Sequence, residues 1–177
     1  MISCVARKTG HAPAAIRPEL MSFRTVLFIY NLLMPIVFLI SAPGYFLKMK
    51  RRGNFGKNFW QRFGFYSLAT RRRLFTEQPI WIHAVSVGEV MLALKLIAKL
   101  REQAPRQPIV LSCTTSTGYQ LATERENGDY TTIYNPLDLL FPVLRAVRQV
   151  NPRLLILVEA ELWPNLLWQI KRRQIPI

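Results

Sequence analysis

The sequence is poor in cysteine and in acidic residues. Its 177 residues include 2 Cys, 2 His and 10 Asp plus Glu against 24 Lys plus Arg, which gives a formal net charge of +14. Two cysteines exclude a disulfide-stabilised scaffold, and together with two histidines they leave too few ligands for a zinc site. The patterns GxxxxGK[ST] and GxGxxG are missing, which excludes a P-loop and the dinucleotide-binding fingerprint. We therefore expect neither a metal nor a cofactor.

Hydrophobic residues make up half of the chain, which excludes a disordered protein, and the length suits one domain with an additional segment. The charge is distributed unevenly. Residues 1–77 hold 13 basic and 2 acidic residues, whereas residues 78–177 hold 11 basic and 8 acidic residues. The basic character therefore belongs to the N-terminal part.

A run of 23 residues without charge extends from Thr25 to Leu47. As a helix it would be about 35 Å long, enough to cross a hydrocarbon core of about 30 Å. Pro35 and Pro43 would kink this helix, which membrane helices tolerate. A cleaved signal peptide and a hydrophobic surface hairpin are the alternatives, but the run is long for a signal peptide and no small-residue cleavage site follows it. We expect residues 22–48 to form a transmembrane anchor after an N-terminal extension at 1–21.

Residues 49–77 combine basic and aromatic side chains. Nine positive charges and no acid lie between Lys48 and Arg73, so the positive-inside rule places the C-terminal part in the cytoplasm. The interleaved aromatic residues favour a position among lipid headgroups; they are Phe55, Phe59, Trp60, Phe63, Phe65 and Tyr66. Such a composition also binds single-stranded nucleic acid, but its place directly after a membrane span favours lipid. We expect membrane lipids and no nucleic acid as partners.

From residue 79 onward, short apolar runs alternate with helical patterns four times. The pattern predicts strands at 79–85, 108–113, 131–134 and 153–158, and helices at 89–103, 117–126, 138–149 and 164–173. Alternation of this kind is typical of βαβ units, so the predicted fold is α/β with a Rossmann-like parallel sheet over 78–177. Residues 175–177 look like the beginning of a fifth strand, which suggests that the chain is a fragment.

Polar residues follow each predicted strand, at the edge of the sheet where a ligand pocket is expected. Ser86 and Glu89 have the spacing of a capping box, as do Thr117 and Gln120. Glu89 is therefore either a helix cap or a carboxylate that faces the pocket and takes a proton from a hydroxyl group. The hydroxyl-rich turn at 114–118 either caps a helix or binds an anion.

Other polar residues of these turns also have structural explanations. Asp138 is most simply an N-cap, and His83 is most simply a hydrogen-bonded core histidine. Glu159 and Glu161 precede a helix that begins at Pro164. The helix macrodipole explains one acidic residue there but does not obviously require two, so this pair is a functional candidate.

Two segments carry a resemblance to a known family. Residues 81–89 (WIHAVSVGE) and 159–165 (EAELWPN) closely resemble the 3-deoxy-D-manno-octulosonic acid (Kdo) transferases. These are membrane-anchored glycosyltransferases that add Kdo to the lipid A precursor. The order of features from about residue 22 onward is similar to that family, although the family pattern usually has Thr where this chain has Ala160.

The resemblance implies a GT-B enzyme of the inner membrane, of which this chain would be the anchor and the N-terminal acceptor domain. Glu89 would be the general base that activates a hydroxyl of lipid IVA, which attacks the anomeric carbon of CMP-Kdo with inversion. Glu161 would be a second catalytic carboxylate. The implied substrate-binding residues are Ser86, Gly88, Thr115, Thr117, Gly118 and Glu159. The donor domain would lie outside this chain, so we expect the chain alone to be inactive.

Two alternatives stay open at this stage: another GT-B glycosyltransferase with a lipid-linked acceptor, and a membrane-anchored binding domain without catalysis. The helix predicted at 89–103 adds one hypothesis. Its apolar surface is wider than a one-sided packing stripe, so part of it, including Leu92 and Leu96, either meets acyl chains or packs on two sides in the core.

Overall fold

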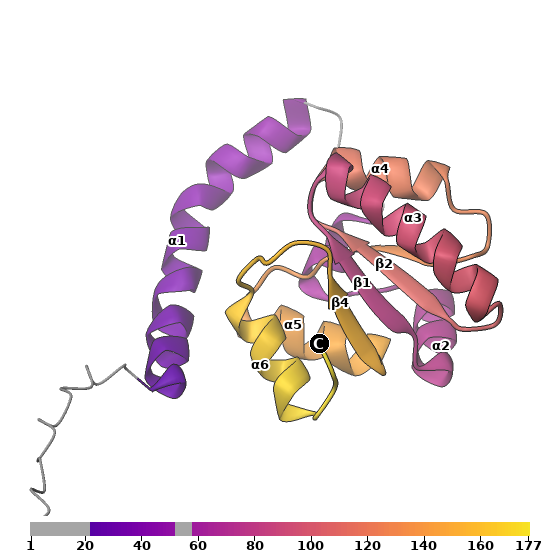
Figure 1. The fold of residues 1–177 in the computed structure, drawn as a ribbon. Coiled ribbons are helices and arrows are strands. Elements are labelled where there is room, and N and C mark those ends of the chain that lie inside the picture. The colour runs from indigo at the N-terminus through magenta and orange to yellow at the C-terminus, as the bar shows by residue number, and fades with distance from the viewer. Residues whose placement is uncertain (1–21, 52–57) are drawn as a thin grey trace, which may run out of the picture.

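The computed structural model describes residues 22–51 and 58–177, and its described part contains a four-stranded parallel sheet (Figure 1). The strands are β1 (Ile80–Ala84), β2 (Ile109–Cys113), β3 (Thr131–Tyr134) and β4 (Leu154–Leu157). Their order is β3-β2-β1-β4, which corresponds to the first four strands of the Rossmann order 3-2-1-4-5-6. The predicted α/β class and its four parallel strands are confirmed.

Helices cover both faces of the sheet. Helices α3 (Val87–Gln103) and α4 (Ser116–Glu124) pack on one face, and α2 (Leu68–Glu77), α5 (Leu140–Val150) and α6 (Pro164–Arg172) pack on the other. Successive side chains of β1 point to opposite faces, so Trp81 belongs to the core under α5 and α6 while Ile82 belongs to the core under α3. Burial on both faces explains why the strands read as continuous apolar runs.

The register of the sheet brings the strand ends to one level. Ala84 of β1 is paired with Cys113 of β2, which is paired in turn with Tyr134 of β3. On the other side, His83 of β1 is paired with Leu157 of β4. The turns after all four strands therefore open at the same edge, as the sequence pattern predicts.

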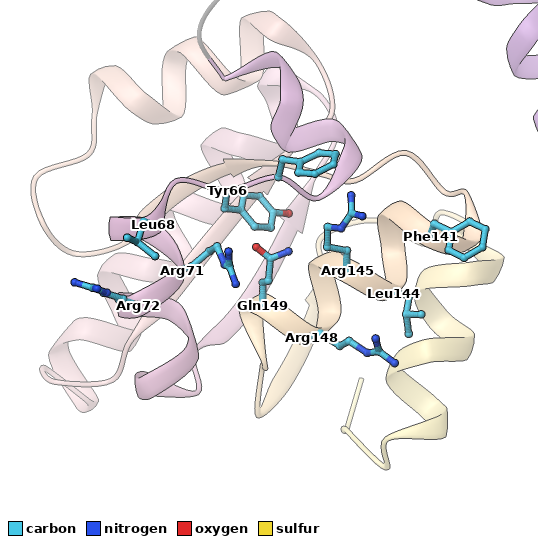
Figure 2. Close-up of a pocket in the computed structure, with 10 residues that line it drawn as sticks. Tyr66, Leu68, Arg71, Arg72, Phe141, Leu144, Arg145, Arg148 and Gln149 are labelled. Atoms are coloured by element: carbon cyan, nitrogen blue, oxygen red, sulfur yellow. The ribbon is translucent and has the colours of Figure 1, made fainter.

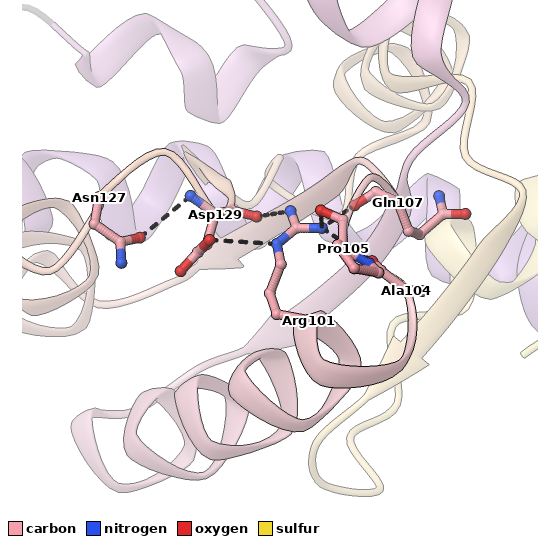
Figure 3. Close-up of polar contacts among 6 residues, drawn as sticks. All are labelled: Arg101, Ala104, Pro105, Gln107, Asn127 and Asp129. Carbon is pink, nitrogen blue, oxygen red and sulfur yellow. Dashed lines mark hydrogen bonds and ion pairs between the residues drawn. The ribbon is translucent and has the colours of Figure 1, made fainter.

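Arg101 connects two loops at the amino-terminal edge of the sheet, opposite the edge at which the four turns open (Figure 3). Its guanidinium donates hydrogen bonds to the carbonyl oxygens of Ala104, Pro105 and Gln107 in the loop after α3, and to that of Asp129 in the loop before β3. The Asp129 carboxylate lies 3.5 Å from Nε of the same side chain. One side chain thus satisfies the carbonyl groups of two loops that are far apart in the sequence.

Helix α1 (Phe23–Arg51) contains the predicted anchor, and its Phe23–Gly44 segment is long and apolar enough to cross a membrane. One side of this helix contacts the α/β domain. Tyr30 donates a hydrogen bond to the Asp138 carboxylate (2.9 Å), and Asn31 donates one to the Asn165 side chain (3.0 Å). The Tyr30 and Asn31 side chains of the apolar run are therefore paired with groups of the domain, and Ser41 of the same run donates a hydrogen bond to the Val37 carbonyl oxygen of its own helix.

The described residues between α1 and β1, which were expected to lie among lipid headgroups, pack in part into the α/β domain. It forms a 3₁₀ helix, η1 (Phe59–Phe63), followed by α2. Phe59 and Tyr66 are buried rather than lipid-facing, because they pack into the domain, whereas Trp60 and Phe65 are exposed. Arg62 is also buried. The N-terminal extension at 1–21, and Phe55 with it, lie outside the described residues.

The predicted fifth strand at residues 175–177 is not formed. The carbonyl oxygen of Pro176 accepts a hydrogen bond from the amide of Leu155 in β4 (3.0 Å), so this segment does lie along the outer edge of β4. Pro176 has no N–H to return to the ladder, which limits the pairing at that position.

Candidate functional site

The turns after β1 and β2 are joined by hydrogen bonds to one carbonyl group. The Val85 oxygen accepts from the amide of Thr115 (3.2 Å) and from its hydroxyl (2.9 Å). The Thr115 hydroxyl also accepts from the amide of Gly118 (3.1 Å), which makes Thr115 the N-cap of α4. Thr115 and Gly118 therefore fix the relative position of two turns, and the expected capping box between Thr117 and Gln120 is not formed because α4 begins earlier.

Glu89 forms the capping box that its spacing predicts. One carboxylate oxygen accepts from the amide of Val85 (2.8 Å) and the other from the amide of Ser86 (3.0 Å), while the Ser86 hydroxyl accepts from the amide of Glu89 (3.3 Å). Burial acts to raise the pKa of Glu89, but these hydrogen bonds outweigh it, so the pKa lies below the ordinary glutamate value. Glu89 is 5% exposed and is ionised at neutral pH.

Glu161 lies in the turn between β4 and α6 and has the opposite pKa shift. Burial is the largest cause that raises its pKa, and the negative charges of Glu89 and Glu159 raise it further. Its carboxylate accepts a hydrogen bond from the indole N–H of Trp163 (3.1 Å), which counteracts the increase only in part. The turns that carry Glu89 and Glu161 open at the same edge of the sheet, after the neighbouring strands β1 and β4. The Glu159 side chain is exposed.

His83 packs in the core against Trp163, the residue that donates a hydrogen bond to Glu161. Its ring meets the Trp163 ring edge to face at 5.5 Å, and its Nδ1 lies 2.9 Å from the Ser112 hydroxyl. Burial lowers the pKa of His83 to about 4, so the ring is neutral at pH 7. Within the described part of the chain its Nε2 has no hydrogen-bond partner. The prediction of a hydrogen-bonded core histidine fits Nδ1 but leaves Nε2 unexplained.

The two glycine candidates differ in the space around them. A Cβ atom on Gly118 would lie 2.9 Å from the Thr115 hydroxyl and 3.4 Å from Val90, so glycine is required for the two turns to approach. A Cβ atom on Gly88 would lie 3.8 Å from the Ser86 hydroxyl, an ordinary contact. Ser86, Gly88 and Thr117 are exposed at the edge of the site, where a ligand can reach them.

Asp138 is a helix cap, but for a different helix from the expected one. Its carboxylate oxygens accept from the amides of Asn165 (3.0 Å) and Leu166 (2.9 Å), in the first turn of α6. Helix α5, which was expected to start at Asp138, begins at Leu140. Burial raises the pKa of Asp138 even though these amide hydrogen bonds lower it. Asp138 thus positions the helix that directly follows the Glu161 turn.

Arg62 and Trp163 are two residues of the site region whose roles the sequence analysis did not find. The Arg62 guanidinium lies over the Tyr134 ring at 4.0 Å and donates to the carbonyl oxygen of Thr114 (2.8 Å), in the turn after β2. The only sequence signal for this contact is the position of Arg62 among aromatic residues. Trp163 was visible within the EAELWPN segment, but its hydrogen bond to Glu161 depends on the conformation of the turn.

Metal chemistry has no visible support at this edge. Between residues 22 and 51 and between 58 and 177, no three His, Cys, Asp or Glu side chains are grouped so that they could hold a metal ion. The chemical resources of the site are two carboxylates with opposite pKa shifts, a neutral histidine and the amides of helix N-termini. Such a combination suits the removal of a proton from a hydroxyl group.

A parallel sheet covered by helices on both faces, in the strand order β3-β2-β1-β4, defines a Rossmann-like α/β domain. The family model of 3-deoxy-D-manno-octulosonic-acid transferase (kdotransferase) matches residues 57–177. The chain therefore belongs to the Kdo transferase family.

Curated relatives agree with this membership. A 3-deoxy-D-manno-octulosonic acid transferase of Haemophilus influenzae is 39% identical over 116 residues, which are 66% of this chain and 26% of that protein. A transferase of the same name from Chlamydophila psittaci is 30% identical over 82% of this chain and 33% of its own length. A bifunctional glycosyltransferase/methyltransferase of Fusobacterium nucleatum is 34% identical over 81% of this chain and 21% of its own length. The chain thus spans between a fifth and a third of these relatives.

Proposed function

We propose that this chain is the acceptor-side part of an enzyme that transfers Kdo from CMP-Kdo to lipid IVA in lipopolysaccharide biosynthesis. The observation that carries the proposal is the place of Glu89 and Glu161 in turns at the carboxyl edge of the sheet, with the Glu89 carboxylate oriented by the amides of Val85 and Ser86. This pair lies within the segment that matches the Kdo transferase family. In this proposal the domain is the N-terminal half of a GT-B fold.

The proposed step is an inverting displacement at the anomeric carbon of Kdo. An acceptor hydroxyl forms the new C–O bond and gives its proton to the Glu89 carboxylate, while the bond from the anomeric carbon to the phosphate oxygen breaks and CMP leaves. The amides of Val85 and Ser86 fix the direction of that carboxylate. Glu89 is a weak base in the free site, and an acceptor that excludes water would raise its pKa towards a more effective value.

The remaining candidates have supporting roles in this proposal. Glu161 orients the acceptor hydroxyl, and Glu159 contributes negative charge at the mouth of the site. The exposed residues Ser86, Gly88 and Thr117 contact the sugar or acceptor, whereas Thr115 and Gly118 act by holding the two turns together. Helix α1 attaches the domain to the inner membrane, with the domain on the cytoplasmic side, where its acyl-chain-bearing substrate lies.

The test uses this chain joined to the donor-side half of the Haemophilus influenzae enzyme, in detergent, with CMP-Kdo and lipid IVA. CMP release and Kdo transfer are measured for the wild-type sequence, for Glu89→Gln, and for Glu102→Gln as a control on the same helix. We expect Glu89→Gln to lower the transfer rate by about 10²–10⁴-fold. Glu102 is exposed and pairs with Lys99, so its variant should retain the wild-type rate. Full activity of Glu89→Gln would remove the base assignment, and no transfer by the wild-type sequence would contradict the proposed reaction.

A second candidate function is a membrane-anchored binding domain without catalysis. It is favoured by one observation, since both oxygens of Glu89 are engaged by backbone amides in a complete capping box. A purely structural Glu89 would make Glu89→Gln less stable but equally active per folded molecule. The transfer assay separates the two functions when it is run well below the melting temperature of each variant.

A further inference from the structure

Helix α1 is docked on the domain over much of its length. The Phe23 ring lies 5.6 Å from the Trp168 ring of α6, and the Phe38 ring lies 6.3 Å from the Phe63 ring of η1. At a rise of about 1.5 Å per residue, these two contacts are about 23 Å apart along the helix axis. Figure 1 shows α1 on the outside of the domain, with its N-terminal part beside α6. The buried and half-buried side chains of α1 recur every three or four residues and so form one face; they include Leu27, Tyr30, Asn31, Met34 and Phe38.

Two hydrogen bonds fix this face to buried groups of the domain. Tyr30 donates to the Asp138 carboxylate and Asn31 donates to the Asn165 side-chain oxygen, and both acceptor residues are at most 6% exposed. The Asn165 amide group in turn donates to the Asp138 carbonyl oxygen (2.8 Å), so these residues form one network. Without the docked helix, the buried Asn165 oxygen would lose the donor that Asn31 provides, and the polar side chains of α1 would be left to lipid. The docked position is therefore the one for which these side chains are suited.

Charged groups near both ends of the docked stretch limit its depth in a membrane. Arg24 and Lys171 are exposed and line one pocket together with Phe23. Arg145 is exposed near the other end, where it donates to the Phe63 carbonyl oxygen (3.4 Å). Because charged side chains are costly in hydrocarbon, both ends belong at the level of water or lipid headgroups.

The docked stretch therefore fits along a membrane surface rather than across a bilayer. Past Phe38, the run without charge continues only to Leu47. As a helix this remainder is about 14 Å long, less than half of a hydrocarbon core of about 30 Å. The remainder of α1 is thus too short to cross a bilayer by itself.

The face of α1 that points away from the domain is apolar. Large side chains on this face are more than half exposed; they include Phe28, Leu32, Leu33, Ile36, Leu39 and Ile40. Two exposed aromatic rings lie in segments that contact α1: Trp60, whose ring is 5.8 Å from that of Phe63, and Phe141, close to Asp138 in the chain. Figure 2 shows the Phe141 ring directed away from Tyr66, at the start of α5. An exposed apolar surface with aromatic rings and cations at its border matches the acyl chains and anionic headgroups of a membrane.

We propose that α1 lies in the plane of the membrane, with its outer face among the acyl chains of one leaflet and both of its ends on the side of the domain. The partner is a single leaflet with anionic headgroups, which contact Arg24, Lys171 and Arg145. Trp60 and Phe141 lie at the headgroup boundary. The arrangement differs from a membrane crossing, in which the two ends of α1 would lie on opposite sides. It concerns only how the chain meets the membrane, and it stands independently of the proposed reaction.

The first test measures on which side of the membrane the N-terminal end of α1 lies. The chain is produced in the inner membrane of a Gram-negative host as the variants Ser22→Cys and Glu102→Cys, each in a Cys4→Ser background; Cys113 is buried. A membrane-impermeant maleimide is added to spheroplasts and to inverted vesicles. We expect Ser22→Cys to react at least tenfold more in inverted vesicles, as does Glu102→Cys, whose position on α3 is exposed. Reaction of Ser22→Cys mainly in spheroplasts would show a crossing and overturn the proposal.

The second test measures the depth of the outer face. The purified chain carries an environment-sensitive fluorophore at Leu32→Cys in vesicles that contain phosphatidylglycerol, and the quenchers are lipids with a nitroxide near the glycerol or near the end of the acyl chain. Leu32 lies close to the middle of the Phe23–Gly44 segment, so a crossing would place it where the end-labelled lipid quenches more strongly. We expect the lipid labelled near the glycerol to quench at least twofold more strongly, and neither lipid to quench the same fluorophore at Glu102→Cys. Stronger quenching of Leu32→Cys by the end-labelled lipid, or no quenching by either lipid, would contradict the in-plane position.

A matched pair of variants tests what holds α1 on the domain. Tyr30→Phe/Asn31→Leu removes both hydrogen bonds to the domain, whereas Ser41→Ala removes a hydrogen bond within α1, from the Ser41 hydroxyl to the Val37 carbonyl oxygen (2.7 Å). We expect the double variant to increase the reaction of Ser22→Cys in spheroplasts by tenfold or more, because its apolar run is then free to cross, and Ser41→Ala to leave that reaction within twofold. Circular dichroism checks the fold of each variant. An unchanged reaction in the double variant, or an equal increase in Ser41→Ala, would contradict the role of the two hydrogen bonds.

Discussion

Glu89 and Glu161 should affect the stability of the folded chain in opposite directions. The amides of Val85 and Ser86 stabilise the ionised Glu89 carboxylate, whereas burial and the charge of Glu89 disfavour the ionised form of Glu161. We expect Glu89→Gln to lower the free energy of unfolding at neutral pH. Glu161→Gln should raise it, because the amide keeps an oxygen that accepts from Trp163 and removes the charge.

The magnitude for Glu89→Gln follows from its contacts. A glutamine can satisfy one of the two backbone amides but turns an NH₂ group towards the other, which loses a hydrogen bond to a charged group of about 1.5–3 kcal/mol. The charge at the N-terminus of α3 contributes a further 0.3–1 kcal/mol, approximately. The expected loss is therefore about 2–4 kcal/mol, or a decrease in melting temperature of about 4–16 °C for a chain of this size.

The pH dependence of the two effects follows from the direction of each pKa shift. The folded-state pKa of Glu89 lies below the ordinary value of 4.5, so its stabilisation is fully present above that value and is lost as the pH falls through the folded-state pKa. The folded-state pKa of Glu161 lies above 4.5, so its ionisation destabilises the fold at neutral pH and this penalty vanishes in acid. Glu161→Gln should therefore approach the wild type as the pH falls to 4.5, and Glu89→Gln only at lower pH, as the pH falls through the folded-state pKa of Glu89.

The assay is urea denaturation of the chain in neutral detergent, followed by far-ultraviolet circular dichroism at pH 7.5 and in acid. This signal avoids the fluorescence of Trp163, which contacts Glu161 directly. Glu102→Gln on the exposed side of α3 serves as the control and should change the unfolding free energy by less than about 0.5 kcal/mol. A decrease in stability for Glu161→Gln as large as that for Glu89→Gln, or a Glu89→Gln effect that persists undiminished in acid, would refute the reasoning.

Three further predictions concern the same domain. Gly118→Ala should destabilise it by about 1–3 kcal/mol through the close approach to Thr115, whereas Gly88→Ala should have no such cost in thermal melts, and equal effects would contradict this difference. Asp138→Ala should destabilise it by about 3 kcal/mol because two buried amides of α6 lose their acceptor, and a melting temperature within 2 °C or so of the wild type would show that water replaces the carboxylate. Leu92 of α3 is 54% exposed. If α3 contacts acyl chains, Leu92→Glu should weaken lipid IVA binding by about tenfold in a folded protein. Unchanged affinity would contradict that hypothesis.

The sheet and most of its helices could be predicted because each strand is an apolar run bounded by turn residues. The structure places β1 at Ile80–Ala84 within the predicted 79–85, and β4 at Leu154–Leu157 within 153–158. Parallel strands buried on both faces leave this signal in the sequence without any tertiary information. The convergence of Glu89 and Glu161 follows from the same topology, since both residues come directly after strands that end at one edge.

The features that could not be predicted depend on contacts between distant segments. Asp138 caps α6, 27 positions later in the chain, and no local pattern distinguishes that from capping α5. Arg62 is directed inward because the Tyr134 ring and the Thr114 carbonyl group offer its charge partners inside the domain. A basic and aromatic stretch has the same composition whether its side chains face lipid or a neighbouring strand. Composition therefore could not predict which side chains of residues 59–66 are buried in the domain.

The two interpretations of Glu89, helix cap and general base, do not exclude each other. A carboxylate offers about four acceptor positions, and the amides of Val85 and Ser86 use two of them. Those bonds hold the group in one orientation, which is what a base needs in order to meet a hydroxyl at a fixed position.

The same hydrogen bonds also lower the pKa of Glu89, which makes it a weaker base until a substrate excludes water. The pKa of Glu161 is shifted the other way, because burial and then the negative charge of Glu89 disfavour its ionised form. The cost of this arrangement is a destabilised charge at Glu161, and a turn that served only to stabilise the fold would have no need of such a charge.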